Sequence, residues 1–128
     1  MTKLWLIATG VNGFLAVALG AFGAHGLKKF LADAPDGALR LQWWQTGTQY
    51  HLAHALALGL VAVLATHVAG RVPAAAGWCF VAGIVLFSGS LYVMTLTNLR
   101  PLGAVTPVGG LCLLAGWALV TAAAWRLR

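Results

Sequence analysis

The stretch WWQTGTQYHLAHALAL, residues 43–58, decides how this chain folds and in which solvent. Amides, hydroxyls and two histidines occupy its first part, and its second part begins an apolar run that continues to Ala65. A helix needs about 20 apolar residues to cross the hydrocarbon core of a bilayer. The stretch therefore predicts a membrane helix with a polar beginning, and it is the segment of the chain whose residues suggest chemistry.

The composition of the whole chain supports the same environment. Of its 128 residues, 61% are hydrophobic and 8% are charged, whereas a soluble domain has about 25% charged residues. The apolar residues form long runs with short polar segments between them. We therefore predict one all-α membrane domain, an integral membrane bundle of four transmembrane helices with an amphipathic N-terminal extension on the second. The predicted helices are residues 4–24, 38–67, 74–97 and 107–125.

A row of small residues follows the first predicted helix. Its members recur every four residues and are Ala8, Asn12, Ala16, Gly20 and Ala24. Such rows let membrane helices approach closely, and we expect the Asn12 amide to face a partner helix because an amide facing lipid is costly. Lys3 precedes this segment, as in a cleaved signal peptide. The segment is long for one and the remaining chain also spans the membrane, so we expect it to be retained.

The second predicted helix is longer than the membrane requires. At 1.5 Å per residue it measures about 45 Å, against roughly 30 Å for the hydrocarbon core. We expect its first third to leave the core, to tilt or to bend near Gly47. One helical face carries Gln42, Gln45, Thr46 and Gln49, with Tyr50 and His54 along its edge. We expect this amide face to point into the bundle, and Trp43 and Trp44 to anchor in the head-group layer, where tryptophan is enriched.

Capping residues predict the remaining helix boundaries. The glycines of residues 20–26 are placed to end the first helix, and Asp36 to cap the second. Thr106 followed by Pro107 predicts the start of the fourth helix. Residues 102–105 would then be non-helical chain that is shielded from lipid by the bundle.

Pairs of small residues predict where the last two helices make close contacts. Gly83 and Ser90 lie two turns apart on the third helix, and Gly109 and Gly116 lie two turns apart on the fourth. Small side chains at this spacing form one packing face.

The basic residues exclude one class of partner and leave the orientation open. They stand singly or in pairs at the ends of apolar runs, which suits lipid head groups, so we expect no nucleic-acid partner. One membrane side carries Lys3, Arg71, Arg126 and Arg128 with both termini, and the other carries Lys28, Lys29, Arg40 and Arg100. Equal numbers give the positive-inside rule no preference. We place the termini in the cytoplasm, and a chain that inserts both ways and pairs antiparallel is the alternative.

Four blocks of sequence resemble one family of small membrane proteins. They are GAFGAHGL at residues 20–27, WWQTGTQYHLAHALAL at 43–58, AGIVLFSGSLY at 82–92 and LGAVTPVGGLCLLAGW at 102–117. In this order they resemble the four-helix proteins named domain of unknown function 423 in bacteria and transmembrane protein 256 in vertebrates. The resemblance covers nearly the whole chain. It implies an inner-membrane protein if the source is bacterial, and no established activity, substrate or catalytic residue.

The resemblance also marks individual positions. It places eight residues in family-like motifs: His25, Gln49, Tyr50, His54, Ser88, Ser90, Thr106 and Pro107. His51 is not a position that the resemblance marks.

Histidines and cysteines are the candidate metal ligands. His51 and His54 are three residues apart on one flank of a helix and can share a metal, with His25 as the further histidine on that membrane side. His25 or His54 would also suit a haem iron. Neither set is complete, so we predict no bound metal or cofactor. Cys79 and Cys112 form no CxxC pair; we expect apolar fillers, with a disulfide between neighbouring helices as the alternative.

A polar patch near the membrane surface is the preferred candidate site. A short connection makes the first two helices antiparallel neighbours, so His25, Gln49 and His54 would surround this patch, with Tyr50 at its margin. The patch would hold a lipid head group, a quinone ring or water, or it would be an internal network that fixes helix register. The full set of candidates is His25, Gln49, Tyr50, His54, Asn12 and Ser90.

These observations favour a non-enzymatic protein that binds a lipid or assembles with itself or with a larger membrane complex. Membrane lipids and a homo-oligomer are therefore the expected partners. One alternative is a small transporter or channel with a polar path past Asn12, His54 and Ser90. The other is a redox accessory protein that binds haem, a quinone or a metal. Both acids lie in a loop, which weighs against an ion-coupled carrier.

Overall fold

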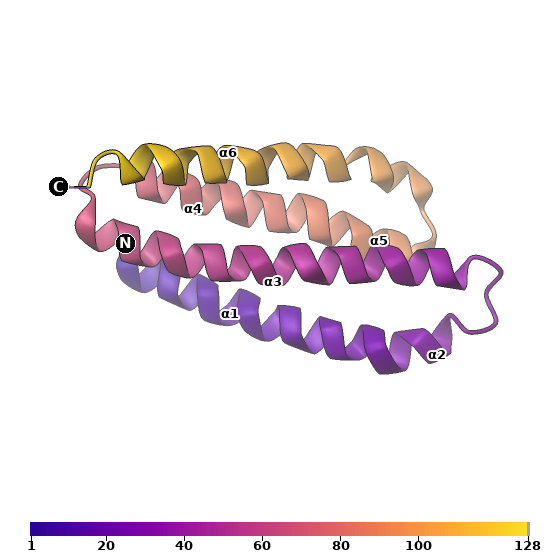
Figure 1. Ribbon diagram of the computed structural model, residues 1–128. Helices are drawn as coiled ribbons and strands as arrows, with labels where there is room; N and C mark the ends of the chain where they lie inside the picture. The colour runs from indigo at the N-terminus through magenta and orange to yellow at the C-terminus, as the bar shows by residue number, and fades with distance from the viewer. Residues whose placement is uncertain (128) are drawn as a thin grey trace.

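Long helices laid side by side form the whole molecule (Figure 1). The computed structural model describes residues 1–127, and these contain no strand. Four helical segments are long and apolar enough to cross a membrane: Thr2–Phe30, Gly37–His67, Val72–Thr97 and Arg100–Ala124. The predicted all-α bundle of four transmembrane helices is confirmed.

The first segment is longer than predicted. Helix α1 (Thr2–Phe22) continues through a π-helical turn, η1 (Gly23–Leu27), into α2 (Lys28–Phe30). The expected helix end at the glycines is wrong, because Gly23 keeps right-handed helical dihedral angles. The Trp44 ring packs so closely on Gly23 that a Cβ atom at this position would overlap it. Burial of Leu27 and Leu31 beside Trp44 holds the extra turn on the bundle. Gly20 faces open space and Ala24 is exposed, so the predicted small-residue row leaves the interface at its end.

Helix α3 (Gly37–His67) is one uninterrupted α-helix of 31 residues. Its outer part faces the opposite way from the prediction. Trp44 is buried and its indole N–H donates to the Leu19 carbonyl of α1 at 2.8 Å, whereas Gln42, Gln45 and Gln49 are exposed. An indole ring buries far more apolar surface than an amide and needs only one hydrogen bond. The expectation that the amide face points into the bundle is therefore wrong.

The second half of the chain packs through glycines. The third segment consists of α4 (Val72–Gly83), the π-helical turn η2 (Ile84–Ser88) and α5 (Gly89–Thr97). It runs antiparallel to α6 (Thr106–Ala124) (Figure 1). The facing pairs are Gly83 with Leu113, Phe87 with Gly109, and Phe80 with Gly116. A Cβ atom on any of these glycines would overlap its partner, so the predicted close contacts at all three are confirmed.

The connection before α6 is helical, contrary to the expectation for residues 102–105. The third segment ends at Asn98, which has the left-handed φ of 56°, and the chain then forms a 3₁₀ helix, η3 (Arg100–Ala104). Thr106 does not cap α6. Its hydroxyl lies 2.7 Å from that of Ser90, because a partner on the neighbouring helix is within reach.

Charged side chains connect the elements at the end of the bundle that carries the α2–α3 loop, which we call the loop end. Asp36 stands at the N-cap of α3 but makes no capping hydrogen bond; its carboxylate lies 3.7 Å from Arg40 and 3.2 Å from Arg100. Arg40 is part-buried, and its guanidinium donates to the Thr95 carbonyl at 2.8 Å. Arg100 also lies over the Trp43 ring, 5.7 Å from its centroid. These contacts fix the α2–α3 loop against the end of α5.

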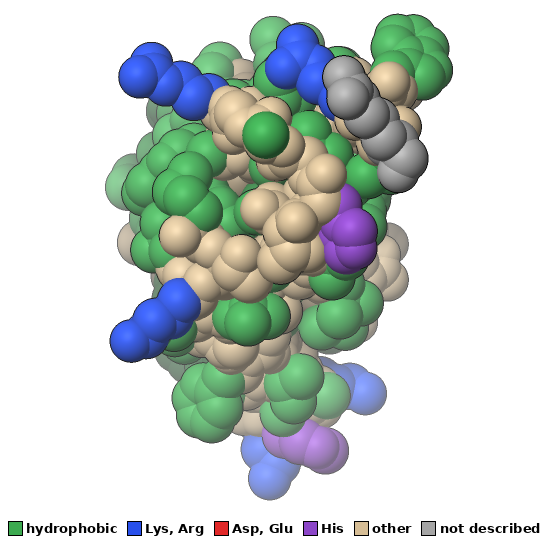
Figure 2. Space-filling model, turned by 90° about the vertical axis from the view of Figure 1, so that its left-hand side faces the viewer, with side chains coloured by type: hydrophobic (Ala, Val, Ile, Leu, Met, Phe, Trp, Pro, Cys, Tyr) green, Lys and Arg blue, Asp and Glu red, His purple; other side chains and the backbone are tan. Residues whose placement is uncertain are grey.

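The opposite end carries both termini. Figure 2 shows basic side chains around its rim and no acidic side chain among the described residues on that face. Both acids lie at the loop end, in the segment before α3. Acids contribute little to topology, so a cytoplasmic location of the termini stays a prediction.

Candidate functional site

A chain of hydrogen bonds joins three helices inside the bundle. The Asn12 amide nitrogen donates to the Ala8 carbonyl at 2.8 Å, so the Asn12 oxygen faces His51 Nε2, 3.2 Å away. His51 Nε2–H is then the donor, and His51 Nδ1 accepts from the Tyr92 hydroxyl at 3.0 Å. His51 is 4% exposed. This arrangement satisfies a neutral His51 ring and links α1, α3 and α5.

Hydroxyl groups tie the other helices in the same way. The buried Ser88 hydroxyl donates to the Gly47 carbonyl of α3 at 2.7 Å. Ser90 and Thr106 share a hydrogen bond between α5 and α6. Because lipid cannot hydrogen-bond to these groups, each contact fixes which helix faces which.

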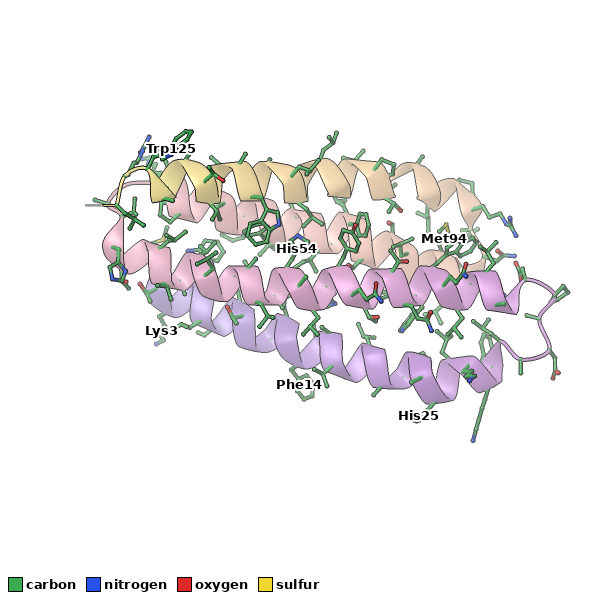
Figure 3. The ribbon with its side chains drawn as sticks, in the orientation of Figure 1. Lys3, Phe14, His25, His54, Met94 and Trp125 are labelled. Carbon is green, nitrogen blue, oxygen red and sulfur yellow. The ribbon has the colours of Figure 1, made fainter. Side chains whose placement is uncertain are left out.

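His54 lies on a different side of α3 and faces α6 (Figure 3). Its Nδ1–H donates to the Tyr50 carbonyl at 2.7 Å, and its Nε2 accepts from the Trp117 indole N–H at 3.1 Å. Both nitrogens of a neutral ring are thereby used. A metal or haem iron at His54 would have to displace Trp117 or break the bond within α3.

An open groove adjoins His54 between α3, η2 and α6. We call it the α3–α6 groove; its volume is about 440 Å³. Its lining residues are Tyr50, His54, Phe87, Pro107, Gly110, Leu111, Leu113, Leu114 and Trp117. His54 and Leu113 form a buried floor, while Tyr50, Leu111 and Trp117 are exposed along the sides. The Tyr50 ring packs on Phe87 with centroids 4.4 Å apart. The groove is thus an apolar and aromatic trough that opens away from the bundle.

The structure does not bring the predicted polar patch together. His25 is exposed and points away from the bundle at the outer side of η1 (Figure 3), Gln49 is exposed on α3, and His54 faces α6. The patch fails because the helix continues through Gly23–Leu27, which turns His25 outward. Asn12 does face a partner helix, as predicted. That helix is α3, and the residue that Asn12 contacts is His51.

The sequence pattern indicated His51 only as a possible metal ligand beside His54, and His51 was not among the candidates for the polar patch. It follows the buried Trp44 by seven residues, which is two helical turns, and so it shares the buried face of α3. This spacing identifies His51 once Trp44 is known to be buried. Among the described residues, no group of three or more His, Cys, Asp or Glu side chains could hold a metal ion.

Comparisons with known proteins identify the family of this chain. A family model described as "Protein of unknown function (DUF423)" matches residues 19–110. The chain belongs to this family. The matched DUF423 region extends from the end of α1 to the start of α6, and therefore includes the histidine-bearing part of α3.

Relatives match along nearly their whole length. UPF0382 membrane protein YwdK of Bacillus subtilis is 47% identical over 123 residues, 95% of this chain and 96% of that protein. UPF0382 inner membrane protein YgdD of Escherichia coli K12 is 44% identical over 131 residues, 99% of this chain and 93% of that protein. No solved structure gave a significant match. This DUF423 protein is a multi-pass inner-membrane protein of an uncharacterised family.

Proposed function

We propose that this DUF423 protein is a non-enzymatic membrane protein that binds one apolar lipid chain in the α3–α6 groove. The observation that carries the proposal is a trough of about 440 Å³ within the membrane-spanning part of the bundle. Ligand pockets typically measure about 300–1,000 Å³ and are mostly apolar with few polar groups. Lipid chains surround the bundle, so an open apolar groove on its side is filled by an apolar chain rather than left without packing contacts.

The length of the groove favours a chain from one leaflet. Along α6 it extends from Pro107 to Trp117, a rise of ten residue steps or about 15 Å, which is half of the roughly 30 Å hydrocarbon core. Its inner end is at His54, near the middle of α3. Its outer end points toward the loop side of the membrane, where α6 begins. A lipid tail that enters from that side would end close to His54.

The polar groups near the groove favour binding over catalysis or transport. Both His54 nitrogens have partners, and the Tyr50 hydroxyl is the uncommitted hydrogen-bonding group on the wall among the described residues. Asn12 and Ser90, which a polar path would use, are bonded across helix interfaces. These contacts support a static binding surface.

Filling the groove tests the proposal. A Cβ on Gly110 would meet the Phe87 ring at 3.8 Å, an ordinary contact, so Gly110→Leu adds bulk to the groove without displacing a helix. Gly13→Leu is the matched control, because Gly13 has open space around it on α1. Native mass spectrometry from mild detergent would count bound lipids. We expect one lipid on the unchanged protein and on Gly13→Leu, and none on Gly110→Leu. Equal retention by both variants, or none by the unchanged protein, would refute the proposal.

A further inference from the structure

Polar side chains line the outward face of α3. We call them the glutamine stripe: Gln42, Gln45, Thr46 and Gln49, all exposed. Within residues 1–127 the side-chain hydrogen bonds of this part of α3 come from Arg40, Trp44 and Thr48, and none comes from the three amide groups. Each amide carries two donors and an acceptor with two lone pairs, so this face offers many hydrogen-bonding groups that the folded chain does not use.

The inner part of the stripe lies within the hydrocarbon core. Helix α3 has 31 residues, about 46 Å, so a core of roughly 30 Å that is centred on this helix leaves about 8 Å outside at each end. Gln49 follows the first residue of α3, Gly37, by twelve positions, which places it about 10 Å inside the hydrocarbon boundary. Neither water nor lipid tails satisfy an amide at that depth. We therefore expect the Gln49 amide to be covered by a group that offers hydrogen bonds, whereas Gln42 and Gln45 lie at or close to the hydrocarbon boundary.

We propose that a second copy of this chain covers the glutamine stripe, with α3 packed against α3. An amide is both donor and acceptor, so equivalent glutamines related by a two-fold axis complement each other. The stripe carries no charge, and thus does not select a charged partner. Glutamines that bond across helices are a recognised means of joining membrane helices. Beyond the stripe, the same face continues with the exposed Ala53, Leu56 and Leu60, which gives the contact an apolar continuation.

The position of the stripe also decides the relative orientation of the two copies. All its residues lie in the loop-side half of α3, and the other half of that face is apolar. An antiparallel pair would place the amides against Leu56 and Leu60 and leave them unpaired. A parallel pair brings Gln45 to Gln45 and Gln49 to Gln49. The two copies therefore insert with the same orientation.

The α3–α6 groove stays open in this dimer. Tyr50, at the groove, is about 100° further around α3 than Gln49, and His54 faces α6. The dimer contact and the lipid site therefore use different sides of the helix. Bound lipid is measured by mass spectrometry and the dimer by cross-linking, so a negative result for one proposal does not refute the other.

Disulfide cross-linking in native membranes tests the dimer. In a background with Cys79→Ala and Cys112→Ala, Gln45→Cys and Gln49→Cys are oxidised and analysed on non-reducing gels. The control is Phe14→Cys on α1. The bond between Asn12 and His51 sets Phe14 at nearly the depth of Gln49, and its side chain is 74% exposed and points away from the bundle (Figure 3).

The expected result is a cross-linked dimer from both stripe variants and monomer from Phe14→Cys. Cross-linking of Gln45→Cys to a co-expressed Leu60→Cys copy, without Gln45 homodimers, would establish an antiparallel pair and overturn the proposal. Equal cross-linking of all three single variants would indicate random collision and overturn it as well. In a second measurement, single-molecule photobleaching should give two steps for the unchanged protein and one for the variant with Gln42, Gln45 and Gln49 changed to Leu. Two steps from that variant would also refute the contact.

Discussion

Replacing His51 with Leu should destabilise the bundle by breaking its central hydrogen-bond chain. The ring bonds to Asn12 at 3.2 Å and to Tyr92 at 3.0 Å. Hydrogen bonds between membrane helices average about 0.6 kcal/mol, with a maximum near 1.7 kcal/mol. Loss of two such bonds should therefore lower the free energy of unfolding by about 1.2 kcal/mol, and by about 3.4 kcal/mol at most. Leu fills the space with apolar atoms, so the loss reports the hydrogen bonds.

Unfolding by SDS in mixed micelles, followed by tryptophan fluorescence, measures this free energy. His67→Leu is the control, because His67 is exposed and its ring bonds only within its own turn of α3; it should change stability by less than about 0.5 kcal/mol. A double-mutant cycle with Asn12→Leu should give a coupling energy of about 0.6 kcal/mol with His51→Leu. If the two histidine variants lose equal stability, or if the Asn12 and His51 effects simply add, the network does not bind these helices together.

Three further changes probe packing, charge and register. Gly109→Ala should cost about 1–3 kcal/mol in the same assay, because its Cβ would overlap the backbone of η2, whereas Gly110→Ala should leave stability nearly unchanged; similar losses would refute the packing argument. Arg40→Gln should cost about 1.5–3 kcal/mol through loss of the bonds to the last carbonyls of α5, and an unchanged unfolding midpoint would contradict this. Copper-catalysed oxidation should leave Cys79 and Cys112 unlinked by mass spectrometry, because the antiparallel register of α4 and α6 offsets them along the bundle; a disulfide between them would require a different register.

The membrane environment and the number of helices follow from the sequence because they depend only on the length and the number of the apolar runs. Apolar runs of sufficient length predict membrane spans whatever they pack against. Glycine spacing also predicted a closely packed face on the third and on the fourth helix, since Gly83 and Gly109 admit a neighbour only because they have no side chain, but it did not predict that these two faces meet each other. The end of the first segment was not predictable in this way. Whether Gly23 stops a helix depends on whether Trp44, 21 residues later, comes to cover it.

The candidate site was harder to predict because helix rotation was assigned by polarity alone. A rule based on polarity places amides inside the bundle and tryptophans in the head-group layer. For the outer part of α3 it predicted the wrong rotation about the helix axis. In the structure Trp44 takes the inner position, since it buries a large ring and still reaches the Leu19 carbonyl. This rotation brings His51 into the bundle and leaves Gln49 outside. Asn12 and His54 were identified as polar residues in spans, but their partners became apparent only with this rotation.

The distribution of polar groups over α3 explains why this helix holds the bundle together. Lipid gives helices no hydrophobic reason to associate, so polar bonds and close packing must specify which surfaces meet. Bonds from all three other segments reach α3: Asn12 from α1, Ser88 and Tyr92 from the third segment, and Trp117 from α6. Each inward polar group of α3 thereby has a partner. Gln49 of the glutamine stripe has no partner among the hydrogen bonds of the described chain, although at its depth in the membrane an unpaired amide incurs the same cost. A helix that satisfies its inner polar groups so fully is expected to satisfy its outer ones too, and only another molecule can do this.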